Sequence, residues 1–371
     1  MQITAGFDSG NIRCIDCSDP SNVRLTINKD HQSDFYQWFH FRASGVCDMP
    51  LKMVIENAKG AAYVGGWENY QAVASYDRQI WFRVPTTWDG ETLTIDHAPE
   101  TDAVYYAYFA PYSMERHADL VAAAVSSGCT HELLGSTLDG QDMDLLRVGE
   151  GPLNCWLIAR QHPGESMAEW WMEGLLDRLL EADDPVARLL KEKATFHIVP
   201  NMNPDGSARG HLRTNAVGAN LNREWKDASS ERSPEVLCVR EAMAASGVDF
   251  CLDVHGDEAL PYNFIAAAEG IDGWTERLHK LTETFKSAYV RANPDFQTKY
   301  GYEVDAPNSS DLKKCTDYVA QTHDCLSMTL EMPFKDNADA PDEVYGWSPD
   351  RCRILGHSVL DALLAVIDDL R

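Results

Sequence analysis

A histidine and a glutamate lie three residues apart at His162 and Glu165, directly after an apolar run at residues 153–159. The run predicts a buried strand, and the Pro-Gly pair between the two polar residues predicts a tight turn. A second apolar run, residues 250–254, leads directly into His255. Two strand ends can therefore bring two imidazoles and one carboxylate to a single point. Three such ligands and a water form a four-coordinate zinc site with one position open for chemistry, whereas a structural zinc site normally has four protein ligands.

A single carboxylate, Glu331, interrupts another apolar run at residues 327–333. The run predicts a strand, and a glutamate inside it is costly to bury unless it is paired or lies at a wet site. Glu331 is therefore either an active-site residue or an edge-strand residue that faces water. Beside a metal-bound water, such a carboxylate can accept a proton and later deliver it to a leaving amine.

Polar residues suited to binding a substrate follow the Asn-Pro-Asp-Gly sequence at residues 203–206, which predicts a plain turn after a strand at residues 195–200. Arg213 carries a permanent positive charge. Asn222 and Arg223 together offer an amide donor and a planar fork of donors. Each of these residues alone is more often a solvated loop residue, so the hypothesis depends on their occurrence together.

The order and spacing of these motifs resemble those of the zinc metallocarboxypeptidases: HxxE, NPDG, an arginine, Asn-Arg, a second histidine and a late glutamate on a strand. The resemblance is closer to the cytosolic carboxypeptidase branch, which has a β-rich domain in front of the peptidase domain and a short interval between NPDG and Asn-Arg. Here that interval reads NPDGSARGHLRTNAVGANLNREW, and the TLEMPF sequence around the late glutamate is also similar. For catalysis, the resemblance covers roughly residues 110–371.

The resemblance implies a zinc-dependent carboxypeptidase that hydrolyses the C-terminal peptide bond of peptides or proteins, with a zinc-bound water as the nucleophile. It implies that His162, Glu165 and His255 bind Zn²⁺. It gives Glu331 the role of general base and acid, and Arg213 the role of polarising the scissile carbonyl. The same ligand set accepts other divalent ions as well.

The resemblance also assigns the residues that hold the substrate. Asn222 and Arg223 match the pair that binds the terminal carboxylate, which makes the enzyme an exopeptidase because an internal bond offers no such charge. Thr316 falls at the position of the floor of the specificity pocket. The pancreatic-type enzymes have a mobile tyrosine ahead of this floor, but the corresponding position here is Ser309 or a neighbour. The sequence assigns that role to none of the nearby tyrosines, which are Tyr300, Tyr302 and Tyr318.

The 371 residues exceed what one hydrophobic core usually serves, which predicts two domains. Short runs typical of strands, separated by turn residues, occupy the first part of the chain; they lie at residues 35–42, 79–84, 91–95 and 103–109. Runs at this spacing predict a small antiparallel β-sandwich. The boundary falls near Pro111, which gives an N-terminal β-sandwich domain at residues 1–110 and a zinc carboxypeptidase catalytic domain at residues 111–371.

Strand and helix patterns alternate after this boundary. Amphipathic patterns predict helices at residues 114–127, 166–180, 234–245, 273–290 and 353–370. The alternation predicts an α/β domain in which helices cover both faces of a parallel or mixed sheet. Ligands in such sheets bind at the carboxyl ends of strands, where the two candidate zinc histidines fall.

The net charge of −26 disfavours nucleic acid as a partner, because phosphates would be repelled. Some members of the cytosolic branch trim glutamates from acidic tails, and Lys313 and Lys314 could form a local basic pocket for such tails, although a solvated loop is the commoner role of such a pair. The sequence has no run of 18 apolar residues, so it predicts no membrane span, and its first residues are not typical of a secretory signal. Ten cysteines without paired spacings then favour reduced thiols and a cytoplasmic location.

Two other functions stay open. Deacylases of the aspartoacylase and succinylglutamate desuccinylase group share the HxxE…His site and an Asn-Arg pair, and they release acyl groups from small N-acyl amino acids. Their turn usually reads His-Gly-Asn-Glu, and they have no β domain in front, so the peptidase is favoured. The third alternative is a non-enzymatic binding module with a vestigial zinc site. It is disfavoured because every expected catalytic position is filled.

Overall fold

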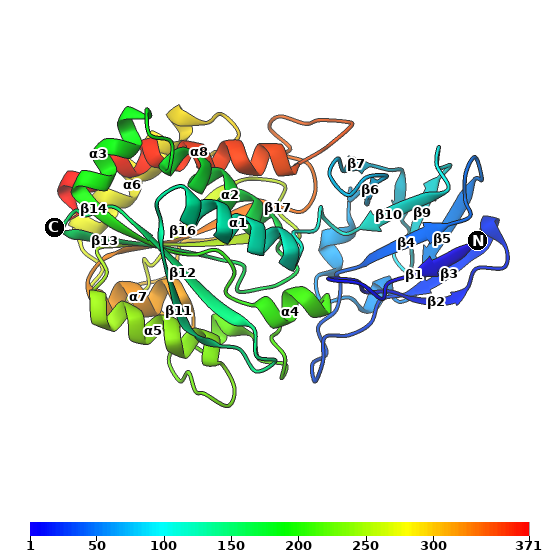
Figure 1. The fold of residues 1–371 in the computed structure, drawn as a ribbon, viewed down its shortest axis with the longest axis horizontal. Coiled ribbons are helices and arrows are strands. Elements are labelled where there is room, and N and C mark those ends of the chain that lie inside the picture. The colour runs from blue at the N-terminus through cyan, green and yellow to red at the C-terminus, as the bar shows by residue number, and fades with distance from the viewer. Residues whose placement is uncertain (371) are drawn as a thin grey trace.

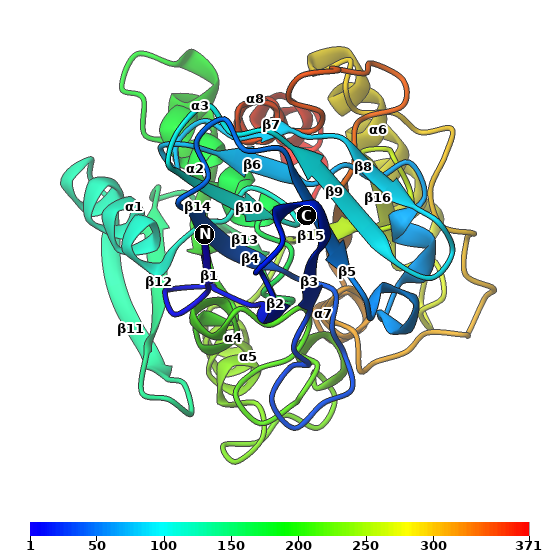
Figure 2. The same ribbon diagram turned by 90° about the vertical axis from the view of Figure 1, so that its right-hand side faces the viewer.

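The computed structural model describes residues 1–370, which form a front part of two β-sheets beside a larger α/β part (Figure 1). Figure 2 looks onto the front part, whose sheets cover one end of the α/β part. The first front sheet has the strand order β1-β4-β10-β6-β7 and is antiparallel throughout. Its strands are β1 (Gln2–Thr4), β4 (His40–Ser44), β6 (Val73–Ser75), β7 (Phe82–Arg83) and β10 (Ala103–Ala107).

The second front sheet has the order β2-β3-β5-β9-β8 and contains one parallel pair, β3 with β5. Its strands are β2 (Arg13–Asp16), β3 (Val23–Thr26), β5 (Leu51–Ile55), β8 (Thr86–Trp88) and β9 (Leu93–His97). The predicted antiparallel sandwich is confirmed apart from that pair, which is parallel because the chain passes through β4 of the other sheet between the two strands. Leu25 and Met53 on one sheet and Phe41 and Tyr106 on the other belong to a single buried core.

Residues 35–39, predicted as part of a strand, form none, and the ladder begins only at His40. Their side chains bind the surrounding loops instead. The Trp38 indole N–H donates to the Ser9 carbonyl oxygen at 2.9 Å. Short 3₁₀ helices connect other parts of the chain; they are η1 (Pro20–Asn22), η2 (Ala58–Gly60), η3 (Val64–Trp67), η4 (Leu221–Arg223) and η5 (Ile367–Asp369).

A seven-stranded sheet forms the centre of the α/β part, in the order β11-β12-β14-β13-β15-β17-β16. Its strands are β11 (Thr130–Ser136), β12 (Asp142–Val148), β13 (Leu153–Ala159), β14 (Ala194–Val199), β15 (Phe250–Asp257), β16 (Phe264–Ala267) and β17 (Leu326–Pro333). The central strands β14, β13, β15 and β17 are parallel, and the pairings at both edges are antiparallel. The predicted mixed sheet is therefore confirmed.

Helices cover both faces of this sheet (Figure 1). They are α1 (Met114–Ser126), α2 (Met167–Leu179), α3 (Pro185–Lys193), α4 (Pro204–Arg209), α5 (Pro234–Ser246), α6 (Glu276–Ala292), α7 (Cys315–His323) and α8 (Pro349–Leu364). Helices α2, α6 and α8 pack together on one face, and α5 and α7 lie on the other. Successive residues of β13 face alternate sides, since Leu157 belongs to the first core while Trp156 and Ile158 belong to the second. Burial on both faces explains the nearly unbroken apolar run.

The structure corrects two of the local predictions. The plain turn predicted at residues 203–206 is wrong, because helix α4 begins at Pro204. The Asn203 side chain accepts a hydrogen bond from Gly206 N at 3.0 Å and caps that helix. The last predicted helix, residues 353–370, begins earlier and ends earlier, as α8 followed by η5.

Helices α2 and α8 are in close backbone contact through two glycines. A Cβ atom at Gly174 would lie 2.1 Å from the Arg353 carbonyl oxygen, and one at Gly356 would lie 2.2 Å from the Trp171 carbonyl oxygen. Neither glycine can gain a side chain unless the helices separate. Because α2 directly follows the candidate metal-binding turn, this contact also fixes the position of that turn.

Two buried cations join the front part to the α/β part. Arg83 of β7 donates to carbonyl oxygens of the segment after β17, at Phe334 (2.9 Å) and Trp347 (3.1 Å). In the opposite direction, the Lys335 ammonium donates to the Glu68 carbonyl oxygen at 2.8 Å. Each part therefore satisfies backbone acceptors of the other.

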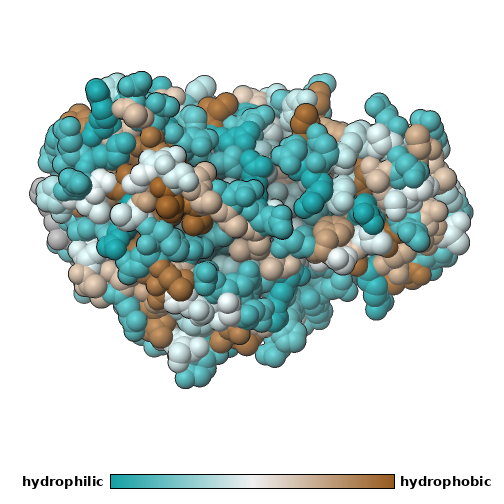
Figure 3. All heavy atoms as spheres, in the orientation of Figure 1, coloured by the Kyte–Doolittle hydropathy of each residue, from teal (hydrophilic) through white to brown (hydrophobic). Residues whose placement is uncertain are grey.

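Hydrophilic side chains dominate the face of the molecule in Figure 3, with hydrophobic residues scattered among them. This distribution agrees with the formal net charge of −26. Within residues 1–370, no helix combines the length and the apolar composition needed to cross a membrane.

Candidate active site

Three side chains that can bind a metal ion meet where β13 and β15 end. His162, Glu165 and His255 are all buried, and their ligand atoms lie within 4.8 Å of one another. Glu165 Oε1 lies 2.7 Å from His162 Nδ1, and Glu165 Oε2 lies 2.7 Å from His255 Nδ1. The two Nδ1 atoms are 3.2 Å apart. Two imidazole nitrogens and a carboxylate are a donor set typical of catalytic zinc sites.

The turn that carries His162 and Glu165 is held from behind by Arg160. This residue follows β13 and has a left-handed backbone (φ 61°), which is unfavourable for a residue with a large side chain. Its buried guanidinium donates to the Pro163 carbonyl oxygen at 3.1 Å and to the Glu169 carboxylate at 2.6 Å. These hydrogen bonds offset the backbone strain and fix the turn.

The second ring nitrogen of each histidine also has a partner. Asp253 Oδ2 lies 2.8 Å from His255 Nε2, and Asn220 Oδ1 lies 3.1 Å from His162 Nε2. Oxygen acceptors at these positions favour the tautomer that presents Nδ1 to a metal, an arrangement typical of metal-binding histidines. The residues present therefore fit a zinc ion.

The two histidines have different electrostatic surroundings. Burial and the neighbouring Arg213 guanidinium lower the pKa of His162 to about 3, so its imidazole is neutral. Burial acts in the same direction on His255, but Asp253 and Glu165 raise its pKa well above the ordinary value. Only a neutral imidazole binds a metal, so metal binding at His255 opposes this raised pKa.

Glu331 lies beside this group on β17, directly opposite His255 in the parallel pairing with β15. It is 7% exposed, and burial raises the pKa of its carboxyl group well above the ordinary value. Its Oε2 atom is buried and has no hydrogen-bond partner among the residues that the structure describes. The edge-strand alternative is wrong, because β17 lies between β15 and β16. An unpaired acceptor next to a metal-binding group suits proton transfer.

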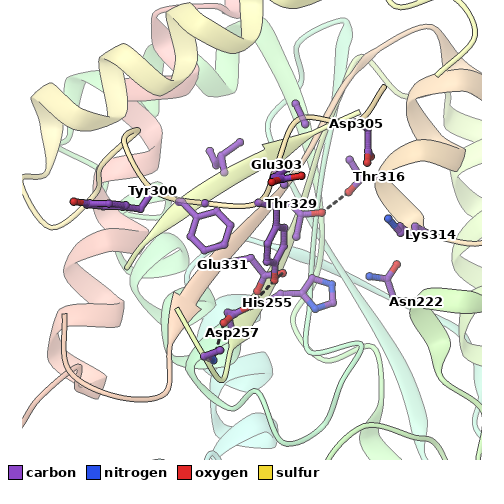
Figure 4. Close-up of a pocket in the computed structure, with 18 of the residues that line it drawn as sticks. Asn222, His255, Asp257, Tyr300, Glu303, Asp305, Lys314, Thr316, Thr329 and Glu331 are labelled. Carbon is purple, nitrogen blue, oxygen red and sulfur yellow. Dashed lines mark hydrogen bonds between the residues drawn. The ribbon is translucent and has the colours of Figure 1, made fainter. Parts of the chain in front are cut away.

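One tyrosine that the sequence left unassigned reaches into the site. The Tyr302 hydroxyl lies 3.2 Å from Glu331 Oε1 and 2.7 Å from Asp257 Oδ2. Tyr300 instead stacks on Tyr262 with ring centres 4.4 Å apart, and Figure 4 shows it away from Glu331. Of these two tyrosines, both of which line the cavity, Tyr302 is therefore the one whose hydroxyl contacts Glu331.

Arg213 reaches the metal-binding group from the loop between α4 and η4. Its Nη1 atom lies 3.5 Å from His162 Nδ1 and 3.9 Å from Glu165 Oε1. The side chain is only 14% exposed. A guanidinium in this position can stabilise negative charge that develops beside the metal.

A cavity of about 620 Å³ opens onto these residues and is lined by Asn222, Arg223 and Thr316. Asn222 Oδ1 accepts a hydrogen bond from Cys315 N at 2.8 Å, so its NH₂ group is the end that can bind a ligand. The Arg223 guanidinium donates to the backbone carbonyl oxygen of Asn222 at 2.6 Å, which holds the guanidinium against the neighbouring backbone. Their roles toward a substrate stay predictions.

The predicted pocket floor lies at the start of α7 (Figure 4). Thr316 Oγ1 lies 2.6 Å from Thr329 Oγ1 of β17, and both threonines line the cavity. Lys314 also lines the cavity, whereas Lys313 is exposed. Only one of the two predicted lysines can therefore contribute charge to the pocket.

Some contributors to the site had a signal in the sequence that could have identified them. Asp253 is a carboxylate inside an apolar run, as Glu331 is. Asn220 lies in the same short motif as the predicted Asn-Arg pair. The only sequence signal for Tyr302 was that it lies near the position at which the pancreatic-type enzymes have their mobile tyrosine. His197, predicted as a satisfied core residue, is buried outside the site with its Nε2 3.0 Å from the Asn154 Oδ1.

Two family models match the chain. Residues 3–109 match the cytosolic carboxypeptidase N-terminal domain, and residues 114–355 match the zinc carboxypeptidase family. The two matches meet in the segment between β10 and α1. The exact division into residues 1–110 and 111–371 stays a prediction.

The chain is similar to bacterial proteins over its whole length. It is 53% identical over 371 residues to an uncharacterized protein of Zymomonas mobilis, which covers 100% of this chain and 97% of that protein. The metallo-carboxypeptidase from Pseudomonas aeruginosa, solved in complex with (2-guanidinoethylmercapto)succinic acid, superposes with a TM-score of 0.98 at 47% identity and full coverage of both chains. Cytosolic carboxypeptidase 4 of Mus musculus is 28% identical over 67% of this chain. The matched part is 27% of the mouse protein, so the chain spans about a quarter of that relative's length.

Proposed function

The chain belongs to the zinc carboxypeptidase family, with the front domain of the cytosolic branch, and from this premise we propose that it hydrolyses the C-terminal peptide bond of peptides or proteins. Zinc is the cofactor of this family. One observation carries the proposal: the ligand atoms of His162, Glu165 and His255 lie close enough together to bind one metal ion, and Glu331 lies beside them with an unpaired carboxyl oxygen.

Bound zinc supplies an acidified water and a Lewis acid for the scissile carbonyl. In the proposed reaction, Glu331 accepts a proton from the attacking water at its unpaired Oε2 and later donates it to the leaving amine. The Tyr302 hydroxyl, at 3.2 Å from Oε1, orients the carboxylate for this transfer. Arg213 donates hydrogen bonds to the carbonyl oxygen as negative charge develops there.

Asn222 and Arg223 bind the terminal carboxylate of the substrate in this proposal. Both line the cavity, and a guanidinium can donate two parallel hydrogen bonds to a carboxylate. The similar protein from Pseudomonas aeruginosa binds a substituted succinic acid, and we expect this chain to bind such a dicarboxylic acid through Arg223.

The front domain favours the peptidase over the deacylase alternative, because residues 3–109 match a domain of cytosolic carboxypeptidases and the deacylase group has no β domain in that position. Membership of an enzyme family likewise disfavours the binding module. A cytoplasmic location and the exclusion of nucleic acid stay predictions.

A peptide library followed by mass spectrometry tests the proposal. We expect the loss of single residues from free C-termini, abolished by a chelator and restored by added zinc. His162→Ala should lose both the metal and the activity. Release of N-acyl groups alone would support the deacylase, and full activity of a metal-free preparation would end the zinc mechanism. The masses also report which C-terminal residue is preferred.

A further inference from the structure

The loop that carries Arg213 is bound by the front domain. The Asp30 carboxylate accepts hydrogen bonds from three successive backbone N–H groups, those of Leu212 (2.7 Å), Arg213 (2.8 Å) and Thr214 (3.0 Å). It also accepts one from Thr214 Oγ1 at 3.1 Å. Asp30 is 2% exposed and lies between β3 and β4. One buried carboxylate therefore determines the direction of the backbone at Arg213.

The front domain also covers the Arg213 side chain. The guanidinium carbon lies over the ring of Tyr63 at 5.3 Å from its centre, and over the ring of Phe35 at 5.7 Å. Such cation–π contacts are favourable at these distances. Arg213 Nε is buried and has no hydrogen-bond partner within residues 1–370, so the rings hold this part of the side chain. Asp30, Phe35 and Tyr63 are named the arginine clamp below.

The clamped loop is joined in turn to the metal-binding turn. Gly164 N donates to the Leu212 carbonyl oxygen at 2.9 Å. A Cβ atom at position 164 would lie 2.8 Å from that oxygen, so the turn and the loop touch as closely as glycine allows. A displacement of the loop therefore changes the position of Arg213 relative to His162.

We propose that Asp30 is a positioning residue for Arg213, and that the front domain, through the arginine clamp, sets the oxyanion-stabilising side of the active site. This inference rests on the proposed function, because the role of Arg213 belongs to it. In this proposal a front-domain residue, Asp30, positions an active-site residue, Arg213, that lies 183 positions later in the chain.

Asp30→Asn tests the inference, because the new NH₂ group cannot accept the loop's N–H groups. We expect kcat to fall about tenfold to hundredfold, the usual effect of misplacing a catalytic group by about 1 Å or losing an oxyanion donor. KM should change less than about threefold, because ground-state binding is left intact. Zinc content should not change. Asp89→Asn is the control, since this front-domain carboxylate also accepts backbone N–H groups, from Glu91 (2.8 Å) and Thr92 (2.7 Å), but these donors belong to its own exposed turn and not to the loop of Arg213. It should retain wild-type kcat.

A double-mutant cycle separates positioning from general damage. Arg213→Ala should lower kcat by itself, and adding Asp30→Asn should lower it less than about threefold further if Asp30 acts through Arg213. The inference would be overturned if the fold-reductions in kcat of the two single variants multiplied in the double variant. A wild-type kcat in Asp30→Asn would also overturn it. If Asp30→Asn does not fold, Phe35→Leu replaces it in the cycle. A further fall in kcat of less than about threefold on top of Arg213→Ala would then support the inference, and fold-reductions that multiply would overturn it.

Amide hydrogen exchange gives a measure that needs no turnover. In Asp30→Asn, a peptide spanning residues 210–215 should exchange at least about tenfold faster than in the wild type, because an NH₂ group replaces one of the two oxygens that accept from the backbone N–H groups of Leu212, Arg213 and Thr214. Unchanged protection there would refute the positioning role even in an active enzyme. A wild type that releases no C-terminal residue would instead refute the proposed function, and the exchange result would then decide only whether Asp30 holds the loop that carries Arg213.

Discussion

Individual polar atoms in the site are buried without complete hydrogen bonding. Glu331 Oε2 and Asp253 Oδ1 both lack a partner among the described residues. A buried acceptor without a hydrogen-bond partner destabilises a fold by about 1–3 kcal/mol, so its presence points to a functional role. For Glu331 the proposed role is proton transfer, while the other oxygen of Asp253 lies 2.8 Å from His255 Nε2.

Replacing Glu331 by glutamine removes the proton acceptor and keeps the shape of the side chain. We expect kcat to fall by about 10²- to 10⁴-fold, the usual contribution of a general acid–base group. Zinc content should equal that of the wild type, because Glu331 is not a ligand. The C-terminal mass assay and metal analysis on one preparation measure both. Normal turnover in Glu331→Gln would remove this residue from the mechanism.

Arg223→Ala removes the proposed partner of the substrate's terminal carboxylate. We expect KM for peptides with a free C-terminus to rise about 10- to 100-fold, because a hydrogen bond to a charged group contributes about 1.5–3 kcal/mol. Amidated peptides lack that charge and should be equally poor substrates of both proteins. A loss of the same size on amidated peptides would contradict the assignment.

Among the secondary-structure elements, a buried chain of charges connects α1, α2 and β12 to the metal-binding turn. His117 of α1 lies 2.6 Å from Glu169 Oε1 of α2 and 3.0 Å from Asp144 Oδ2 of β12. The other oxygen of Glu169 accepts a hydrogen bond from Arg160 at 2.6 Å. Burial alone would lower the pKa of His117, but the carboxylates of Glu169 and Asp144 outweigh it. The pKa of His117 is raised from an ordinary 6.5 to about 9.

This raised pKa predicts a stability that falls with increasing pH. Below pH 6.5 His117 is protonated in both the folded and the unfolded chain, and its stabilisation is complete. As pH rises through about 9 the folded form loses the proton too, and the stabilisation disappears. The free energy of unfolding of the wild type minus that of His117→Asn should fall by on the order of 3 kcal/mol over this window. Denaturant titrations at several pH values measure it, and a difference independent of pH would contradict the prediction.

The contact between α2 and α8 predicts that Gly174→Ala destabilises the protein. Overpacking of this kind typically costs about 1–3 kcal/mol, and the added carbon here meets backbone rather than a flexible side chain. Gly6→Ala is the control, because a Cβ there would meet nothing within 4 Å. We expect its free energy of unfolding to stay within about 0.5 kcal/mol of the wild type. Equal effects of the two substitutions in denaturant titrations would show that the helices can separate freely.

Across the whole molecule, the two parts stabilise each other through Arg83 and Lys335. Arg83→Met leaves the carbonyl oxygens of Phe334 and Trp347 without their donor, which should destabilise the protein by several kcal/mol, on the order of 3. Arg24→Met, at an exposed ion pair with Glu56, is the control and should leave the unfolding midpoint close to that of the wild type. Thermal unfolding compares them, and equal midpoints would contradict the role of Arg83.

The parts of the fold that could be predicted are those with a local signal. The strand predicted at residues 153–159 is β13 (Leu153–Ala159), because burial on both faces leaves an apolar run with clear ends. Glu331 was found in the same way, since its carboxylate contradicts its apolar surroundings. Residues 35–39 have the same composition as a strand, yet Trp38 is buried against a loop, and composition alone does not distinguish the two environments.

Contacts between segments that are distant in the chain have no such local signal in the sequence. Asp30 looks like any loop aspartate in the sequence, and its four hydrogen bonds to the loop at 212–214 exist only after the front domain has docked. Tyr302 was one of three similar tyrosines, and only the path of its loop brings it to 3.2 Å from Glu331. The contacts of Asp30 and Tyr302 therefore depend on the long-range packing of the chain, which the sequence motifs do not predict.

Ribosomes deliver a polypeptide from its amino end, and domains generally fold as units in that order. The arginine clamp is therefore synthesised and can be folded before the segment at 212–214 has left the exit tunnel. The clamp can therefore be in place within the same nascent chain when Arg213 emerges. A chain whose synthesis starts after residue 63 would contain Arg213 and the three candidate metal ligands but would lack Asp30, Phe35 and Tyr63.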